Sequence, residues 1–295
     1  MRFEYVQRVA MIGAGTMGAG IAQLCAQQGL DAVLTDISLD LSEGALAKIA
    51  AGLDKRIAKG KITEEDKNNV LSHMTAAGDL SPAKDADIVI ESVIEHLDIK
   101  KKVFADLDEL AKPDVLLVTN TTSLSISAMA NATKRPDKVV QMHFFNPPTI
   151  MKLVEIMPGK QTSAETLAQA EAFAKQLGKD PVVCKNEAPA GIVSRILGQL
   201  LNEATWLVAS GVADAADVDK AMKLGANHPM GPLELADFIG LDTCLAIMNV
   251  LHDGLADTKY RPCPLLTKYV EAGWLGRKSE RGFYDYRQDP PVPTR

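Results

Sequence analysis

The sequence lacks paired cysteines, an excess of basic residues and any internal repeat or low-complexity tract. Its four cysteines are scattered and form no C-x-x-C pair. This spacing fits free thiols in a reducing compartment and argues against a disulfide framework or a structural zinc site, so no metal ion is expected. The 38 acidic residues outnumber the 32 basic ones, and the net charge of −6 argues against general nucleic-acid binding.

Long hydrophobic runs are also missing. No apolar run approaches the length of a membrane-spanning helix, and the short apolar stretch near the N-terminus is interrupted by glycine, unlike a signal peptide. These absences predict a soluble, cytoplasmic protein with no membrane contact. The 295 residues, 46% of them hydrophobic, are enough for two domains with a sizeable buried core.

A glycine-rich segment near the N-terminus is the most informative motif. The apolar run at 9–12 leads directly into G-A-G-T-M-G at 13–18, and a helix-like apolar pattern follows. This order is typical of a dinucleotide-binding βαβ unit, in which the glycines permit a tight turn, close approach of a pyrophosphate and close helix–strand packing. Backbone N–H groups at the helix start would hold the phosphates. The expected cofactor contacts here are Gly13, Gly15, Thr16, Met17 and Gly18.

Asp36 strengthens this interpretation over that of a glycine-rich structural turn. It closes the next apolar run, 18 residues after Gly18. A carboxylate at this position accepts hydrogen bonds from the ribose 2′-hydroxyl and repels a 2′-phosphate, so the expected cofactor is NAD.

The rest of the chain divides into two parts. Strands are predicted at 9–12, 32–35, 88–92, 116–119, 139–143, 153–156 and 181–184. A charged helical insertion is expected at about 39–74, with a capped helix start at Thr63. Beyond about residue 190 the pattern becomes helical, with an apolar stripe that includes Ile192, Ile196, Leu201 and Ala204. The proline-containing tail is expected to be loose.

These patterns predict an α/β fold with a Rossmann-type NAD-binding domain at 1–187 and an all-helical second domain at 188–295. In open α/β sheets, ligands lie beyond the carboxyl ends of the strands. We therefore expect the active site in a cleft between the two domains.

His143 is the candidate acid/base. It ends the predicted strand 139–143, and Glu155 lies 12 residues later on the next strand. A carboxylate on one imidazole nitrogen fixes the tautomer and leaves the other nitrogen free for proton transfer, which alcohol oxidation requires. A purely structural histidine is the alternative.

Small polar residues follow the predicted strand 116–119, beginning with Asn120, Thr121 and Thr122. They suggest recognition of a hydroxyl or carbonyl group. They also fit an N-cap for a helix that begins near Ser125, and both interpretations can hold together.

Six segments together resemble the L-3-hydroxyacyl-CoA dehydrogenase family, and most closely its short bacterial 3-hydroxybutyryl-CoA dehydrogenases. They are G-A-G-T-M-G-A-G-I-A, N-T-T-S-L, H-F-F-N-P, K-L-V-E-I, A-M-K-L-G-A-N-H-P-M-G-P-L-E-L-A-D and G-W-L-G-R-K. The resemblance extends from Val9 to Tyr286. It implies interconversion of (S)-3-hydroxyacyl-CoA and 3-oxoacyl-CoA with NAD, by a homodimer that associates through the helical domain.

The resemblance also implies residue roles. His143 would be the acid/base and Glu155 would orient it. Residues expected near NAD are Glu95, Lys100 and Lys278, and we place Asn120 and Asn146 of the N-T-T-S-L and H-F-F-N-P segments there as well. The basic part of the insertion, around Lys55 and Lys59, would meet the coenzyme A moiety, although its charge alone also fits a solvated helix face.

Two positions depart from the family pattern. Thr122 stands where the family has serine, and Ser194 stands where it has asparagine. Both are expected to bind the reacting oxygen of the substrate. Because loss of one such donor can cost ~2.7–4 kcal/mol, an NAD-binding homologue with attenuated turnover is one alternative function. A dehydrogenase of a free hydroxy acid, without coenzyme A contacts, is another.

Overall fold

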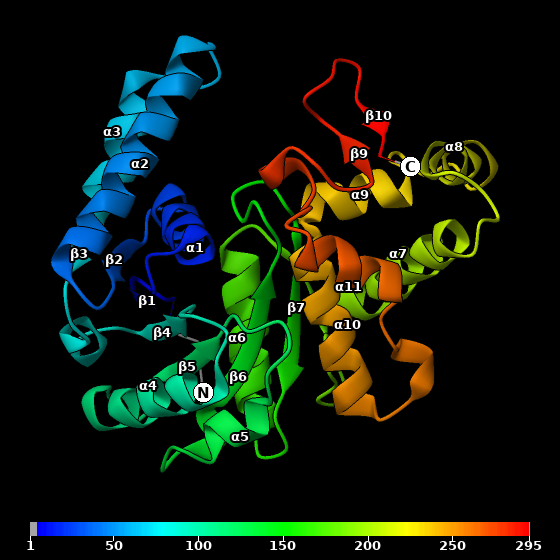
Figure 1. Cartoon of the computed structure of the whole chain (residues 1–295). Helices are drawn as coiled ribbons and strands as arrows, with labels where there is room; N and C mark the ends of the chain where they lie inside the picture. The colour runs from blue at the N-terminus through cyan, green and yellow to red at the C-terminus, as the bar shows by residue number, and fades with distance from the viewer. Residues whose placement is uncertain (1–4, 295) are drawn as a thin grey trace. The chain divides into compact units, whose positions relative to one another are not determined.

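A parallel β-sheet forms the centre of the first part of the chain. The computed structural model describes residues 5–294, and the chain divides into two compact units between Ala188 and Pro189. The sheet of the first unit has the strand order β3-β2-β1-β4-β5-β6-β7-β8, and only the β6–β7 pairing is antiparallel (Figure 1). The strands are β1 (Arg8–Ile12), β2 (Asp31–Thr35), β3 (Met74–Ala77), β4 (Ile88–Glu91), β5 (Leu116–Thr119), β6 (Val139–Phe144), β7 (Leu153–Pro158) and β8 (Asp180–Val183).

The predicted strands are all present within two residues of their expected ends, and the predicted fold class is confirmed. The prediction missed β3, because its sequence M-T-A-A is short and continues the helical insertion without a turn signal. The central strands are buried on both faces, which explains their continuous apolar sequences.

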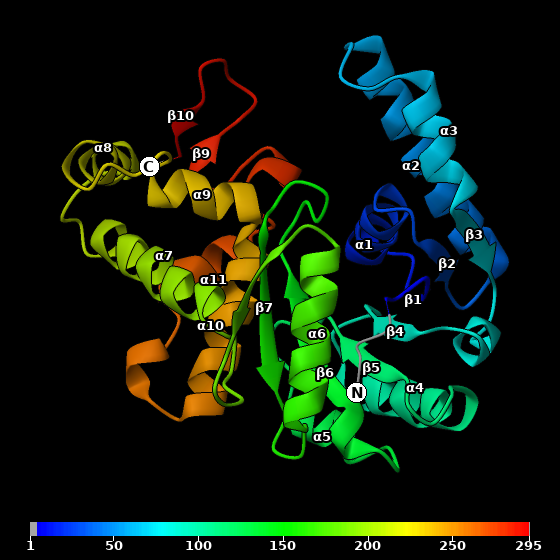
Figure 2. The ribbon, with the colours of Figure 1, turned by 180° about the vertical axis from the view of Figure 1, so that it is seen from behind.

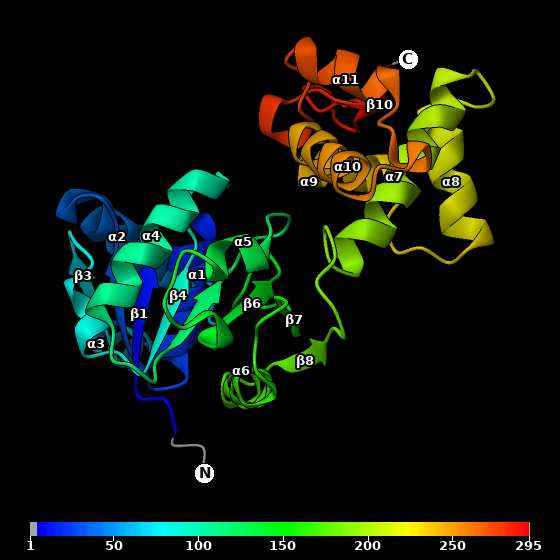
Figure 3. The ribbon, with the colours of Figure 1, turned by 90° about the horizontal axis from the view of Figure 1, so that it is seen from below.

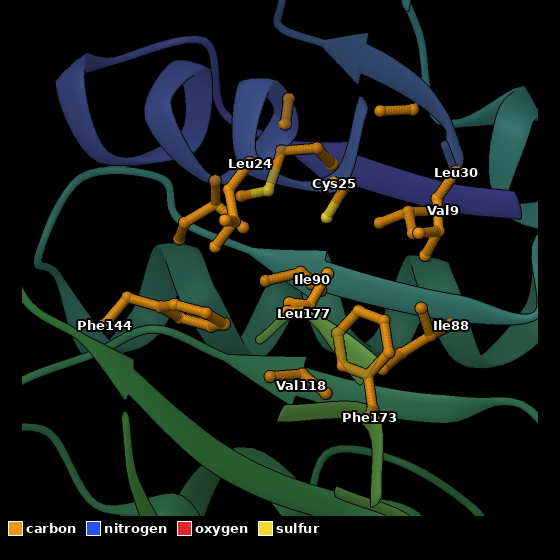
Figure 4. Packing of buried hydrophobic residues seen from close by; sticks show 14 of the residues in the cluster. Val9, Leu24, Cys25, Leu30, Ile88, Ile90, Val118, Phe144, Phe173 and Leu177 are labelled. Carbon is orange, nitrogen blue, oxygen red and sulfur yellow. The ribbon is translucent and has the colours of Figure 1, made fainter. Parts of the chain in front are cut away.

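Helices cover both faces of the sheet. On one face, α1 (Thr16–Gln27) and α6 (Ala164–Gln176) share a core with the strands. Figure 4 shows Phe173 and Leu177 packed with Ile88, Ile90 and Val118 in this core. On the other face, α4 (Leu97–Leu110) and α5 (Ile126–Ala130) form a second core.

The charged insertion forms two helices that lie side by side and extend away from the sheet, α2 (Leu39–Ala58) and α3 (Glu64–Ser72) (Figure 2). The predicted cap at Thr63 is present as a capping box. The Thr63 side chain accepts a hydrogen bond from the Asp66 backbone N–H, and the Asp66 carboxylate accepts one from the Thr63 backbone N–H.

The second unit is mainly helical (Figure 3). Its helices are α7 (Val193–Ala209), α8 (Ala215–Gly225), α9 (Pro232–Ile239), α10 (Leu241–Leu255) and α11 (Pro264–Glu271). Short 3₁₀ turns lie at Thr258–Tyr260 and Arg277–Ser279 in this unit, and at Ser81–Lys84 and Pro136–Lys138 in the first unit. Helix α10 contacts α7, α9 and α11, while α8 packs on α9.

The predicted long helix with an apolar stripe is present as α7. Leu201 and Ala204 on this helix are buried, whereas Ile196 is 65% exposed, and Ile192, which precedes the helix, is 42% exposed. One expectation for this unit needs correction. The proline-containing tail is not loose: β10 (Val292–Pro293) pairs antiparallel with β9 (Tyr284–Asp285). The Thr294 backbone N–H also donates to the Phe283 carbonyl oxygen at 2.8 Å. The prolines gave no sign of these tertiary contacts.

Over residues 5–294, no single helix has both the length and the apolar composition needed to cross a membrane. Only α9 and α10 together reach those values, and this pair is bent by 97°.

A buried carboxylate organises the C-terminal end of the second unit. Asp237 is 1% exposed. Its carboxylate accepts hydrogen bonds from the backbone N–H groups of Phe283 and Tyr284 at 2.9 Å and from the Tyr286 hydroxyl at 3.1 Å. A Cβ at Gly282 would lie 2.0 Å from its Oδ1, so only glycine fits there.

This carboxylate should make stability depend on pH. Burial raises the pKa of Asp237 to about 6 despite the hydrogen bonds, from an ordinary value of 3.8. Between these two values the folded chain binds a proton that the unfolded chain does not, so the free energy of unfolding should fall as pH rises, by roughly 3 kcal/mol. Urea denaturation of the native protein and of Asp237→Asn, measured from pH 4 to 7, should show a fall that the variant lacks. Parallel curves for the two proteins would contradict the raised pKa.

Candidate active site

The glycine-rich turn between β1 and α1 has the geometry of a phosphate site. Gly13 has φ +103°, and a Cβ there would lie 2.5 Å from the Ser92 carbonyl oxygen. A Cβ at Gly18 would lie 1.8 Å from the Gly13 carbonyl oxygen. At Gly15, by contrast, a Cβ would meet no described atom within 4 Å. Gly13 and Gly18 therefore permit the close packing, while the space beside Gly15 is open to a ligand.

The start of α1 and Asp36 complete this site. Helix α1 begins at Thr16, and no side chain among residues 5–294 caps its first turn, which leaves Thr16 and Met17 at a helix N-terminus suited to a pyrophosphate. The Asp36 carboxylate accepts hydrogen bonds from the backbone N–H groups of Ala14 at 2.7 Å and Ile37 at 2.8 Å. Since each carboxylate oxygen can accept more than one hydrogen bond, a fixed Asp36 also suits a ribose hydroxyl. These features fit a dinucleotide.

His143 and Glu155 lie opposite each other on the antiparallel strands β6 and β7. The imidazole Nδ1 is 3.3 Å from Glu155 Oε2, and the imidazole Nε2 is 3.3 Å from the Thr122 hydroxyl. Both side chains are buried, with exposed fractions of 8% and 1%. A carboxylate at Nδ1 favours the tautomer with its proton on that nitrogen, and Nε2 is then the nitrogen that can exchange a proton with a ligand.

The loop that carries Thr122 is held by Glu95. Glu95 Oε1 accepts hydrogen bonds from the Thr121 hydroxyl at 2.5 Å, the Thr122 backbone N–H at 3.1 Å and the Ser123 hydroxyl at 2.9 Å. Burial alone would raise the pKa of Glu95, but the Lys100 ammonium and these hydrogen bonds outweigh it and hold the pKa below its ordinary value. Helix α5 begins at Ile126 and is capped by the Ser125 hydroxyl, which accepts from the Ala128 backbone N–H, and not by one of the small polar residues 120–123 that were expected to cap it.

Of the residues expected near NAD, Lys100 and Asn120 are buried and hydrogen-bonded within the protein, whereas Asn146 is exposed. Lys100 is only 1% exposed, and its Nζ lies 2.5 Å from Glu91 Oε1. The Asn120 amide is 8% exposed; its oxygen accepts from the Phe144 backbone N–H at 2.9 Å and its nitrogen donates to the Ser92 hydroxyl at 3.3 Å. Asn146 is exposed. Direct cofactor contact by these three residues stays a prediction.

The remaining candidates lie farther along the chain. Lys55 on α2 and Lys59 after it are both exposed. In the second unit, Ser194 is half-buried in the first turn of α7, and Lys278 Nζ lies 2.5 Å from both carboxylate oxygens of Asp242. Their proposed roles towards the substrate and NAD, and the expected cleft, also stay predictions.

Sequence reasoning missed one buried acid in this region. Glu91 is fully buried at the carboxyl end of β4, where parallel sheets place their functional residues. The sequence signal that could have found it is its position directly after the apolar run I-V-I, at the end of a predicted strand.

Family models match both units. The NAD-binding domain of 3-hydroxyacyl-CoA dehydrogenase matches residues 8–188, and the C-terminal domain of the same enzyme matches residues 192–286. The first unit is therefore an NAD-binding domain.

Individual relatives cover almost the whole chain. The 3-hydroxybutyryl-CoA dehydrogenase of Bradyrhizobium diazoefficiens is 50% identical over 98% of this chain and 99% of its own. The mitochondrial hydroxyacyl-coenzyme A dehydrogenase of Sus scrofa is 40% identical over 96% and 92% of the two chains. The crystal structure of (S)-3-hydroxybutyryl-CoA dehydrogenase from Ralstonia eutropha has a TM-score of 0.92 at 46% identity, covering 96% of this chain and 100% of its own. Together with the glycine-rich turn and the His143–Glu155 pair, these matches show that the chain belongs to the 3-hydroxyacyl-CoA dehydrogenase family.

Proposed function

We propose that this protein interconverts (S)-3-hydroxybutyryl-CoA and its 3-oxoacyl-CoA with NAD. The placement of His143 between Glu155 and the Thr122 hydroxyl is the observation that carries this proposal. The names of the relatives support the substrate class.

His143 acts as the general base in the oxidative direction. NAD, when bound, supplies the acceptor for the hydride that leaves C3 of the substrate. As the C3–H bond breaks, the hydroxyl proton moves to His143 Nε2 and the C3–O bond becomes a carbonyl. The Glu155 carboxylate beside Nδ1 stabilises the resulting imidazolium. In the reductive direction the imidazolium returns the proton to the alkoxide oxygen.

The other proposed contacts orient the substrate and the cofactor. The hydroxyls of Thr122 and Ser194 hydrogen-bond the reacting oxygen, while Lys55 and Lys59 bind phosphate groups of coenzyme A. The glycine-rich turn and Asp36 hold NAD, together with Glu95 and Lys278. The protein acts in the cytoplasm as a homodimer formed through its second unit.

Oxidation of NADH by acetoacetyl-CoA tests this function. We expect turnover that is followed by loss of absorbance at the NADH band and that requires the thioester. Free acetoacetate serves as the matched control, because it keeps the reacting carbonyl and lacks coenzyme A. Turnover with free acetoacetate alone would instead indicate a dehydrogenase of free hydroxy acids. NADH binding without oxidation by any 3-oxoacyl-CoA would indicate the attenuated homologue suggested by Thr122 and Ser194.

A further inference from the structure

Glu91 is a fully buried carboxylate that the proposed chemistry does not use. Its Oε1 accepts hydrogen bonds from the Val93 backbone N–H at 2.7 Å and from Lys100 Nζ at 2.5 Å. Its Oε2 accepts from the Thr119 hydroxyl at 2.7 Å. A buried charge is costly unless it is paired and hydrogen-bonded, so this degree of satisfaction indicates an ionised carboxylate with fixed geometry.

Lys100 connects this carboxylate to a second one. Its side chain is 1% exposed, and its Nζ donates to the Val93 carbonyl oxygen at 3.3 Å and lies 3.4 Å from Glu95 Oε2. Glu91, Lys100 and Glu95 thus form a three-charge chain in which a buried cation lies between two anions. Because Glu91 holds the Lys100 ammonium in place, this ammonium is a fixed positive charge that attracts and positions the Glu95 carboxylate.

Glu95 in turn holds the loop that carries Thr122. One of its oxygens faces Lys100, and the other accepts all the hydrogen bonds from Thr121, Thr122 and Ser123. Hydrogen bonds to an ionised carboxylate are about twice as strong as neutral ones. The hydroxyl of Thr122 then reaches His143 Nε2 at 3.3 Å.

We propose that the buried Glu91–Lys100 pair is a positioning device for the acid/base. The pair fixes Glu95, Glu95 fixes the loop at residues 121–123, and the loop places the Thr122 hydroxyl against His143. Glu91 and Lys100 are therefore positioning residues that act through Glu95, and the effect on catalysis rests on the proposed function of His143.

The test replaces both buried charges together. Glu91→Gln or Lys100→Met alone leaves the remaining charge without its nearest partner and is expected to destabilise the fold. The double variant Glu91→Gln/Lys100→Met removes both charges at similar volume, so its urea midpoint should be closer to the native value than that of Lys100→Met. Glu95 nevertheless loses its cation in the double variant.

Asp108→Asn is the matched control. Asp108 is also a buried acid of the first unit, with a side chain 4% exposed and an Oδ1 2.7 Å from Arg135 Nε. Like Glu91, it is paired with a cation and accepts a backbone N–H, that of Lys134 at 2.9 Å. It has no link to Glu95 or to the residue 121–123 loop among the contacts of the described chain.

Two measurements decide the proposal. In the double variant, kcat for NADH oxidation by acetoacetyl-CoA should fall between about 10-fold and 10²-fold, with KM for acetoacetyl-CoA within about 3-fold, because displaced groups mainly weaken the transition state. The Cε1–H NMR resonance of His143, assigned with His143→Ala, should move towards its position in Thr122→Val. Asp108→Asn should keep the native kcat and the native His143 resonance.

Either a kcat within 2-fold of native (about 0.4 kcal/mol) in a folded double variant, or an unmoved His143 resonance, overturns the proposal. If the native protein fails to oxidise NADH with acetoacetyl-CoA, the proposed function fails instead. The His143 resonance then decides by itself whether the pair positions the loop.

Discussion

Replacement of His143 by alanine is expected to lower kcat for acetoacetyl-CoA reduction by ~10²- to 10⁴-fold, the usual contribution of general acid–base catalysis. The imidazole Nε2 faces the Thr122 hydroxyl and its Nδ1 faces Glu155, so it is placed for proton transfer. Because the hydrogen bonds and ring contact of His143 within residues 5–294 go to Thr122, Glu155 and Phe145 and not to the glycine-rich turn, the Kd for NADH should change only a few-fold. Steady-state kinetics and NADH fluorescence titration measure the two quantities.

Glu155→Gln is the companion variant. It should lower kcat less than His143→Ala does, because the imidazole can still transfer the proton although it loses the negative charge that stabilises the imidazolium. A kcat for His143→Ala within a few-fold of native would mean that another group is the acid/base.

The second large effect concerns the choice of cofactor. We expect the protein to prefer NADH over NADPH by ~10²- to 10³-fold in kcat/KM. A 2′-phosphate about 4 Å from the Asp36 carboxylate would be repelled by roughly 4 kcal/mol at an effective dielectric constant near 20, before salt screening. The backbone N–H groups of Ala14 and Ile37 hold this carboxylate in place, so it cannot easily turn away.

Asp36→Ser removes the charge and should reduce this preference. The ratio of kcat/KM values for the two cofactors is the informative quantity, because the loss of the hydrogen bond to Ala14 can weaken binding of both. Comparable efficiency of the native protein with NADH and NADPH would refute the role of Asp36.

Much of the site could be predicted because its residues stand at the ends of strands. His143 and Glu155 were paired from strand order alone, and the register of β6 against β7 brings them together. Lys100 shows the opposite case: a lysine in the charged segment L-D-I-K-K-K gives no sign of being buried. Its burial depends on its ion pair with Glu91, which lies at the end of strand β4.

The sequence by itself determined the local features, because each depends on neighbouring residues. These features are the tight turn at Gly13–Gly18, the strand-ending Asp36, the capped helix after Thr63 and the change from strand to helix periodicity near residue 190. Only the tertiary structure decided which charges are buried together and which apolar residues stay exposed. The Asp237 network joins segments distant in sequence. The residues of the Glu91–Lys100–Glu95 chain are close in sequence, but their burial, like the exposure of Ile196, depends on how the helices and strands pack, which no local pattern encodes.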